Sequence, residues 1–199
     1  MAFRDFSFPQ VQLDLGLTVE ETDLYSQVPA AALRPEFVAL VNEGADLALA
    51  VNTEKAKAEF IIAPILFELR RMLPGRFGLF SGVELNVDAS RSLNGYCDFL
   101  LTKMPRQFVL TAPLVAIVEA KNDNLRTGLG QCIAEMYAAQ LFNRNHGTMM
   151  EAIYGAVTTG SAWKFLRLRE ELLALDVKEY YIDNLGKVVG ILKHIVECT

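Results

Sequence analysis

Three side chains that could do chemistry lie at the ends of apolar segments. Asp98 interrupts the segment YCDFLL, and Glu119 and Lys121 end the apolar run LVAIVEAK. Residues two apart on a strand face the same way, so Glu119 and Lys121 would point together while Ala120 points into the opposite layer. If the two strands are neighbours in the sheet, Asp98 lies beside Glu119 and Lys121. Two carboxylates and an ammonium group would then share one edge of a sheet, and hard oxygen ligands of this kind suit Mg²⁺ bound together with phosphate oxygens.

The same residues also have a purely structural interpretation. Glu119 and Lys121 could form a surface ion pair at a strand end, while a backbone amide satisfies Asp98. The E-x-K spacing is common by chance. However, carboxylates in apolar strands are costly without a compensating partner, and this favours a binding site at this position.

The hydrophobic pattern predicts the elements that would position these residues. It predicts, in chain order, a strand over 11–17, helices over 35–50 and 54–73, strands over 77–88, 96–102 and 114–120, a helix over 126–142, strands over 153–159, 163–169 and 179–183, and a closing helix over 185–197. Asn52 or Thr53 can cap the second helix, which Pro64 should kink or restart because proline lacks an N–H donor. Asn94-Gly95 predicts a tight turn. Three strands followed by a crossover helix predict an α/β (α+β) fold in which helices flank a mixed sheet.

Length and composition fit one globular domain. The chain has 199 residues, of which 52% are hydrophobic and 22% charged. We expect residues 1–53 to form a strand-helix extension packed on a core formed by 54–199, because about fifty residues rarely build a core alone. The longest apolar run, over 60–67, is far shorter than the roughly 20 residues of a membrane span, so no membrane partner is expected.

The cysteines and the amino-terminal residues favour a cytoplasmic location. The first ten residues contain Asp5 and no long apolar stretch, so a secretory signal is not expected. Cys97, Cys132 and Cys198 are an odd number and widely spaced. This pattern argues against both a disulfide framework and a CxxC zinc site, and we expect three reduced, non-catalytic thiols.

The net charge of −5 is unevenly distributed. Residues 1–54 contain 2 basic and 9 acidic residues, and residues 55–199 contain 17 basic and 15 acidic residues. The acidic segment is either a solvated surface or a surface for a homodimer lying away from the path of a polyanion. Overall acidity therefore does not exclude nucleic acid as a partner of the remainder.

Across residues 54–169 the sequence resembles the PD-(D/E)XK nuclease superfamily. The resemblance rests on a helix carrying Glu59 before Pro64–Leu66, then on GYCDFLL, LVAIVEAKND and a helix opening at GLGQCIAEM. It implies a restriction endonuclease-like fold and Mg²⁺- or Mn²⁺-dependent hydrolysis of nucleic acid, most simply as a DNA endonuclease. It also assigns roles to six residues: Asp98, Glu119 and the carbonyl of Ala120 as metal ligands, Lys121 as the catalytic partner, Glu59 as the first-helix glutamate, and Gln131 as the glutamine of RecB-like members.

The sequence departs from the family pattern at two positions. Cys97 replaces the proline of the motif, and Glu135 replaces the tyrosine that follows the glutamine in RecB-like members. The superfamily also contains members that have lost activity. A nuclease fold used as a binding or assembly module, or as a subunit of a restriction or repair complex, is therefore the alternative.

Other features give weaker signals. Basic residues that could line a phosphate-binding face are Arg70, Arg71, Arg76, Lys103, Arg106, Arg126, Arg144, Lys164, Arg167 and Arg169. We select Arg126 as the phosphate contact because it opens the helix beside the E-x-K strand. Trp163 and Phe165 could stack on bases or pack in the core. Gly128-Leu129-Gly130 lacks the third glycine of a dinucleotide fingerprint.

Overall fold

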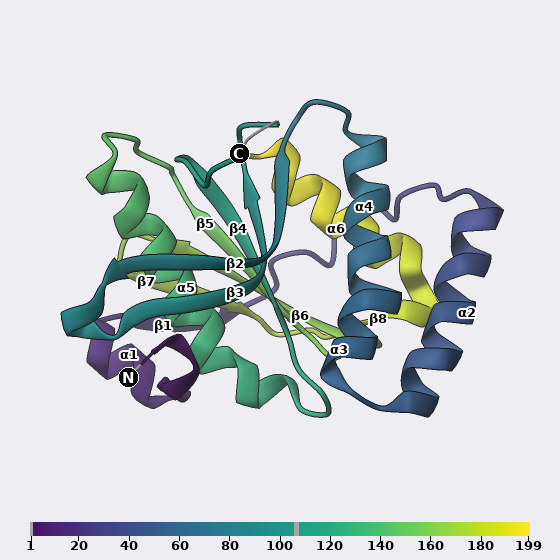
Figure 1. Ribbon diagram of the computed structural model, residues 1–199, viewed down its shortest axis with the longest axis horizontal. Helices are drawn as coiled ribbons and strands as arrows, with labels where there is room; N and C mark the ends of the chain where they lie inside the picture. Colours follow the sequence, from purple (N-terminus) through teal and green to yellow (C-terminus); the bar gives the residue numbers. More distant parts are fainter. Residues whose placement is uncertain (1, 106–107) are drawn as a thin grey trace.

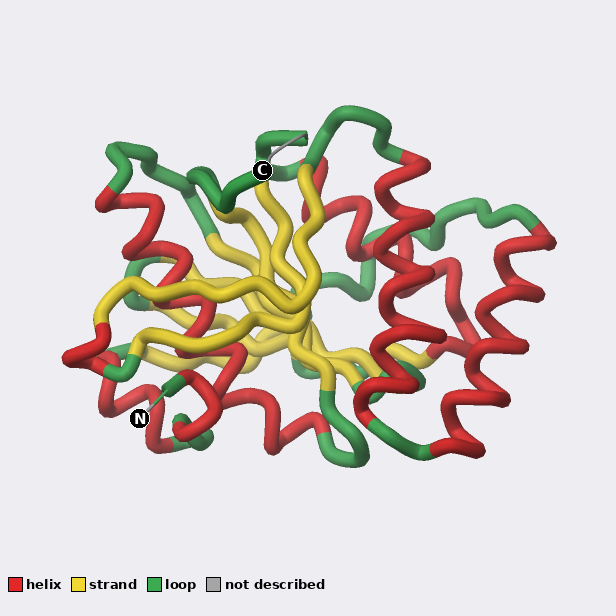
Figure 2. Tube along the Cα trace, viewed as in Figure 1, coloured by secondary structure: helices red, strands yellow, loops and turns green. Residues whose placement is uncertain are grey.

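The computed structural model describes residues 2–105 and 108–199 and shows a mixed sheet with helices on both faces (Figures 1 and 2). The strands are β1 (Thr18–Thr22), β2 (Gly78–Asp88), β3 (Leu93–Thr102), β4 (Leu114–Ala120), β5 (Ile153–Thr158), β6 (Ala162–Arg169), β7 (Leu172–Asp176) and β8 (Tyr180–Tyr181). Their order is β1-β7-β6-β5-β4-β3-β2, with β8 paired to β6. Among the described strands, only β4–β5 and β1–β7 are parallel pairs. The predicted fold class is confirmed.

Helices cover the sheet in two groups. They are α1 (Gln10–Leu15), α2 (Pro35–Val51), α3 (Glu54–Lys57), α4 (Ala63–Met72), α5 (Leu125–Asn145) and α6 (Leu185–Glu197), joined by short turns η1 (Phe3–Asp5), η2 (Ala58–Ile62), η3 (Ala89–Arg91) and η4 (Ile182–Asn184). In Figure 1, α1 and α5 lie on one face, and α2, α3, α4 and α6 lie on the other. A separate apolar cluster fills the space on each face.

The amino-terminal extension differs from its prediction. The strand predicted over 11–17 is wrong, because this segment forms helix α1, which ends at Gly16 with φ +70°. Val11 and Leu15 are both buried, and their spacing of four satisfies a helix as well as an alternating strand. The strand begins only at Thr18, where β1 pairs with β7, a strand that the pattern missed.

The helix predicted over 54–73 is present, but it changes its winding midway. Thr53 caps its start by accepting a hydrogen bond of 3.1 Å from the amide of Ala56. A π-helical turn, η2, separates α3 from α4 and lies just before Pro64. The predicted restart at Pro64 is thereby confirmed.

The sequence predicted a tight turn at Asn94-Gly95, but the turn between β2 and β3 lies elsewhere. These two residues lie inside β3, paired with Asn86 and Leu85 of β2. The connection is η3, whose amides at Ser90 and Arg91 donate to the Asp88 carboxylate. An aspartate that caps its own turn competes effectively with an Asn-Gly turn.

The centre of the sheet matches the sequence pattern. β4 is buried at all seven positions, and α5 provides the crossover to the parallel strand β5. Trp163 and Phe165 are fully buried in β6, so they are core residues and do not present faces to bases. The strand predicted over 179–183 is reduced to β8, which η4 follows.

Candidate metal centre

Asp98 and Glu119 lie on adjacent antiparallel strands. In the register of β3 and β4, Phe99 is opposite Val118, and the next step places Asp98 opposite Glu119. The amide of Ala120 donates a hydrogen bond of 2.8 Å to Asp98 Oδ2. The two carboxylates therefore lie at the same point of the sheet, as the sequence predicted.

Lys121 continues β4 by one residue. Its amide donates to the carbonyl of Thr158 at 2.8 Å, which extends the pairing with β5. Its Nζ lies 2.5 Å from Glu119 Oε1 and 3.2 Å from Gln131 Oε1. The pair is not the surface ion pair of the structural interpretation, because Glu119 is only 1% exposed.

Helix α5 provides a second layer of polar contacts. Gln131 Nε2 donates to Glu135 Oε1 at 3.0 Å, so the amide of Gln131 links Lys121 to Glu135. Glu135 is fully buried. The sequence treated it only as a departure from the family pattern, although its position four residues after Gln131 places both on one face of the helix.

Burial and mutual repulsion shift the pKa values of the carboxyl groups. Burial and, to a smaller extent, the charge of Asp98 together raise the pKa of Glu119 to about 8, although Lys121 opposes the shift. Burial raises the pKa of Asp98, and the Ala120 amide opposes this. Burial and the Glu119 charge raise the pKa of Glu135 well above its ordinary value. Burial alone would lower the pKa of Lys121, but the Glu119 carboxylate outweighs burial and raises it.

Asp98 and Glu119 offer the carboxylate oxygens that a divalent cation needs, but they are too few to complete its coordination. Glu119 Oε2 and Glu135 Oε2 are buried and have no hydrogen-bond partner in the described part of the chain, which is costly for a carboxylate. Asp98 and Glu119 fit the pair of carboxylates with which proteins commonly hold Mg²⁺. Within residues 2–105 and 108–199, no group of three or more His, Cys, Asp or Glu residues is arranged to hold a metal. Water or substrate oxygens would have to complete the coordination.

A pocket of about 260 Å³ opens beside Asp98 on the side of α3. Its lining residues are Glu54, Lys55, Ala58, Glu59, Ala63, Ser81, Gly82, Asp98, Phe99 and Ala120. Gly82 falls between the register pairs that flank Asp98 and has φ +61°. Glycine is the residue that adopts this left-handed backbone without strain, and a Cβ at this position would project into open space.

The structure places two glutamates at this pocket. Glu59 is exposed at its rim and forms an ion pair of 2.8 Å with Lys55. Glu54 raises the pKa of both Glu119 and Lys121, so its charge acts on the buried pair. Sequence reasoning missed Glu54, whose only signal is its place in the first turn of a helix that also carries Glu59.

Lys57 is a second residue that the sequence did not single out. It is 3% exposed and donates to the carbonyl and the side-chain oxygen of Asn122, the latter at 3.0 Å. It also donates to Asn52 Oδ1 at 2.9 Å. Lys57 thereby fixes the loop that directly follows Lys121.

The structure does not bring Arg126 to the Asp98 pocket. Arg126 is exposed in the first turn of α5 and lines a different cleft together with Lys164 and Glu179. Arg71 and Arg169 form ion pairs with Glu68 and Glu151. Arg106 lies outside the described residues.

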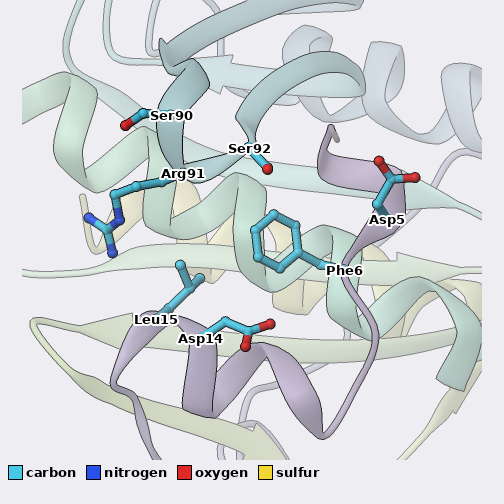
Figure 3. A pocket seen from close by; sticks show the side chains of 7 residues that line it. All are labelled: Asp5, Phe6, Asp14, Leu15, Ser90, Arg91 and Ser92. Atoms are coloured by element: carbon cyan, nitrogen blue, oxygen red, sulfur yellow. The ribbon is translucent and has the colours of Figure 1, made fainter.

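A further cleft lies between the amino-terminal segment and η3 (Figure 3). The ring of Phe6 projects toward its middle, and Asp14 and Arg91 flank it. Arg91 donates to the hydroxyl of Tyr137 at 3.3 Å, and Asp14 accepts from Gln10 at 2.9 Å. Both of these charged groups therefore already have hydrogen-bond partners within the chain.

Comparisons with known proteins add no assignment. No protein-family model matches the chain, and no curated protein matches it in sequence. None of the described helices has both the length and the apolar character that a membrane crossing requires.

Proposed function

We propose that the protein is a divalent-metal-dependent nuclease of the PD-(D/E)XK type that hydrolyses phosphodiester bonds of nucleic acid, most simply of DNA. The proposal rests on Glu119 Oε2, which is buried, has no hydrogen-bond partner among the described residues, and lies across from Asp98 and beside the Lys121 ammonium. The charge of Asp98 helps to raise the pKa of Glu119, and a cation between the two carboxylates would relieve this repulsion. The proposal does not depend on fold analogy alone.

Each residue has a defined role in this proposal. Asp98, Glu119 and the Ala120 carbonyl hold Mg²⁺ or Mn²⁺, which supplies positive charge and Lewis acidity toward a phosphate oxygen. Lys121 stabilises the negative charge that develops on the phosphate. Gln131 orients Lys121 through its hydrogen bond to Nζ.

Two further residues act outside this centre. Glu59 stands at the rim of the pocket, where it can orient the water that enters. Arg126 holds a phosphate further along the substrate.

A binding or assembly module without activity is the second candidate, and one observation favours it. Asp98 accepts from Ala120, and Lys121 is held by Glu119 and Gln131, so much of the cluster is satisfied within the chain. A subunit of a restriction or repair complex would show the same geometry. A homodimer formed through the acidic segment 1–54 stays a prediction, which sedimentation velocity would test.

Cleavage of plasmid DNA and thermal unfolding with Mn²⁺ distinguish these candidates. Mn²⁺ should raise the thermal midpoint of the wild type by about 2–4 °C for each kcal/mol of binding energy. Asp98→Asn and Glu119→Gln should abolish both this rise and cleavage. Lys121→Met keeps both carboxylates, so the rise should persist while cleavage falls by roughly 10²-fold or more.

Glu43→Gln, an exposed carboxylate on α2, serves as the matched control and should change neither measurement. If the wild type shows no carboxylate-dependent Mn²⁺ binding even with DNA present, the nuclease proposal is wrong and the binding module replaces it.

A further inference from the structure

A second pocket adjoins the Asp98 pocket along α4 and β2. It has a volume of about 680 Å³ and is lined by Phe67, Arg70, Gly78, Leu79, Phe80, Pro105 and Phe108. Ala63 of α4 lines the first pocket, and Phe67, one helical turn later, lines the second. On β2, Ser81 lines the first pocket, and Leu79, two residues earlier on the same face of the strand, lines the second. The two pockets therefore lie next to each other along these two elements, and together we call them the α4–β2 groove.

The α4–β2 groove presents aromatic rings to solvent. Phe67 is 64% exposed, and Phe108, which lines the same pocket, is fully exposed. Two exposed phenyl rings that line one pocket form an apolar patch of the kind that marks interaction sites. Their flat faces suit any planar partner, and nucleobases are such partners.

Arg70 adds a positive charge beside these rings. Its guanidinium donates to the carbonyl of Pro105 at 3.3 Å, and within the described ranges it forms no ion pair. By contrast, the neighbouring Arg34 and Arg71 are both occupied by Glu68. A guanidinium that keeps its charge uncompensated beside exposed rings suits a phosphate backbone.

We propose that the α4–β2 groove binds a single-stranded segment of nucleic acid, with bases stacked on Phe67 and Phe108, a phosphate held by Arg70 and the strand leading into the Asp98 pocket. This inference rests on the proposed function and names its substrate class. Single strands are favoured over duplexes because paired bases are already stacked on one another and present only their edges. An apolar protein partner would supply no negative group to pair with the Arg70 guanidinium.

The aromatic part of the groove lies next to the Asp98 pocket, so a bound strand would run from the aromatic rings toward Asp98. Leu79 lies three residues before Gly82, which is opposite Asp98 in the strand register, so the second pocket begins about 10 Å along β2 from that position. A strand that stacks on Phe67 would then place a phosphate further along at Asp98. The scissile bond would lie next to the bound single-stranded segment.

Fluorescence anisotropy with labelled oligothymidine of about 12 nucleotides, in EDTA to prevent cleavage, tests the proposal, because single-strand sites span roughly 4–16 nucleotides. The wild type should bind this probe more tightly than a blunt duplex of the same length. Phe67→Ala and Arg70→Ala should each raise the Kd by about fivefold or more, and Phe67→Trp should restore tight binding. Phe67 is exposed, so these variants should keep the wild-type thermal midpoint.

Matched controls come from surfaces outside the groove. Tyr96→Ala removes a ring that is 66% exposed on β3, and Arg144→Ala removes an exposed guanidinium at the end of α5. Each should change the Kd by less than about twofold. Unchanged binding by the Phe67 and Arg70 variants, or equal affinity for the duplex, would overturn the groove proposal.

The two proposals can fail separately. Asp98→Asn should keep tight binding of the single strand while it loses Mn²⁺-dependent cleavage. If the Phe67→Ala and Arg70→Ala variants keep both cleavage and binding, the nuclease proposal stands and the groove proposal is wrong. If the wild type binds the single strand through the groove but does not cleave it, the groove proposal stands and the nuclease proposal is wrong.

Discussion

Lys57 donates hydrogen bonds to both the backbone carbonyl and the side chain of Asn122 and so joins the first core helix to the loop after the E-x-K strand. An ammonium group that is nearly fully buried is retained only where its partners are in place. The contact links α3, which lines the Asp98 pocket, to the residue that directly follows Lys121. Packing of the helix and placement of Lys121 are therefore coupled.

Lys57→Met tests this coupling. Methionine fills a similar volume, but Asn52 and Asn122 lose their donor, so the free energy of unfolding should fall by about 2–4 kcal/mol. Urea denaturation measures this loss, and cleavage should fall with it. Lys55→Met removes an exposed lysine two residues away and should change stability by less than about 0.5 kcal/mol. Equal effects of the two substitutions would contradict the anchoring role.

The pH dependence of stability should identify Glu119. Its pKa of about 8 in the folded protein lies above its ordinary value of 4.5. Between these pH values the folded protein keeps a proton that the unfolded chain has released, so the free energy of unfolding falls as the pH rises from about 4.5 to about 8. The loss is at most about 1.4 kcal/mol for each pKa unit, and it is complete only above the folded pKa.

Urea denaturation in EDTA at several pH values measures this slope. Glu119→Gln is neutral throughout and should make the slope shallower, and the slope that remains belongs to Asp98 and Glu135, whose pKa values are also raised. Glu43→Gln should keep the wild-type slope, because that side chain is exposed. An unchanged slope in Glu119→Gln would assign the titration to another group.

The sequence predicted the elements whose burial is unambiguous. The run over 114–120 and the helical spacing over 35–50 correspond to β4 and α2 almost residue for residue. The strand predicted over 11–17 failed because the alternating apolar pattern contains Val11 and Leu15, whose spacing of four residues also fits one face of a helix. Strand β7 was missed because a run as short as LLAL carries no periodicity.

The candidate site was predictable only along the strands. Alternation and the E-x-K spacing place Glu119 beside Lys121, and the strand order places Asp98 opposite. Glu135 and Lys57 reach the site from helices, and their roles depend on how those helices dock. No local pattern encodes docking, which is set by packing across the whole core.

Gly128→Ala should separate the placement of Lys121 from metal binding. A Cβ at this position would meet Val157 Cγ1 at 2.6 Å and Lys121 Cγ at 2.8 Å, so the lysine stem must move. We expect the free energy of unfolding to fall by about 1–3 kcal/mol. Carboxylate-dependent Mn²⁺ binding should stay intact, and cleavage should fall by more than the loss of stability explains. Gly130→Ala is the control, because its Cβ would meet the carbonyl of Phe6 at 2.4 Å and not the lysine. If cleavage falls in proportion to stability in both variants, the position of Lys121 does not matter for cleavage and this prediction is wrong.

The three thiols should differ in reactivity. All are free cysteines, with Cys97 and Cys132 buried and Cys198 exposed. Burial raises the pKa of both buried thiols, so little of the reactive thiolate forms. Thiol titration should find one fast group in the native protein and three after denaturation, and Cys198→Ser should remove the fast group. A metal-independent activity that Cys97→Ser abolishes would show instead that a cysteine is catalytic.

The amino-terminal extension should unfold together with the rest of the chain. Phe3 and Val11 are buried in the same cluster as Ile133 of α5, and Phe37 of α2 is buried in the cluster on the other face. Phe3→Ala should therefore lower the free energy of unfolding of the whole protein by about 3–5 kcal/mol, in a single cooperative transition. Leu13→Ala changes an exposed residue of α1 and should have little effect. If limited proteolysis releases residues 1–50 while the remainder stays folded and equally stable, the extension is a separate unit and this prediction is wrong.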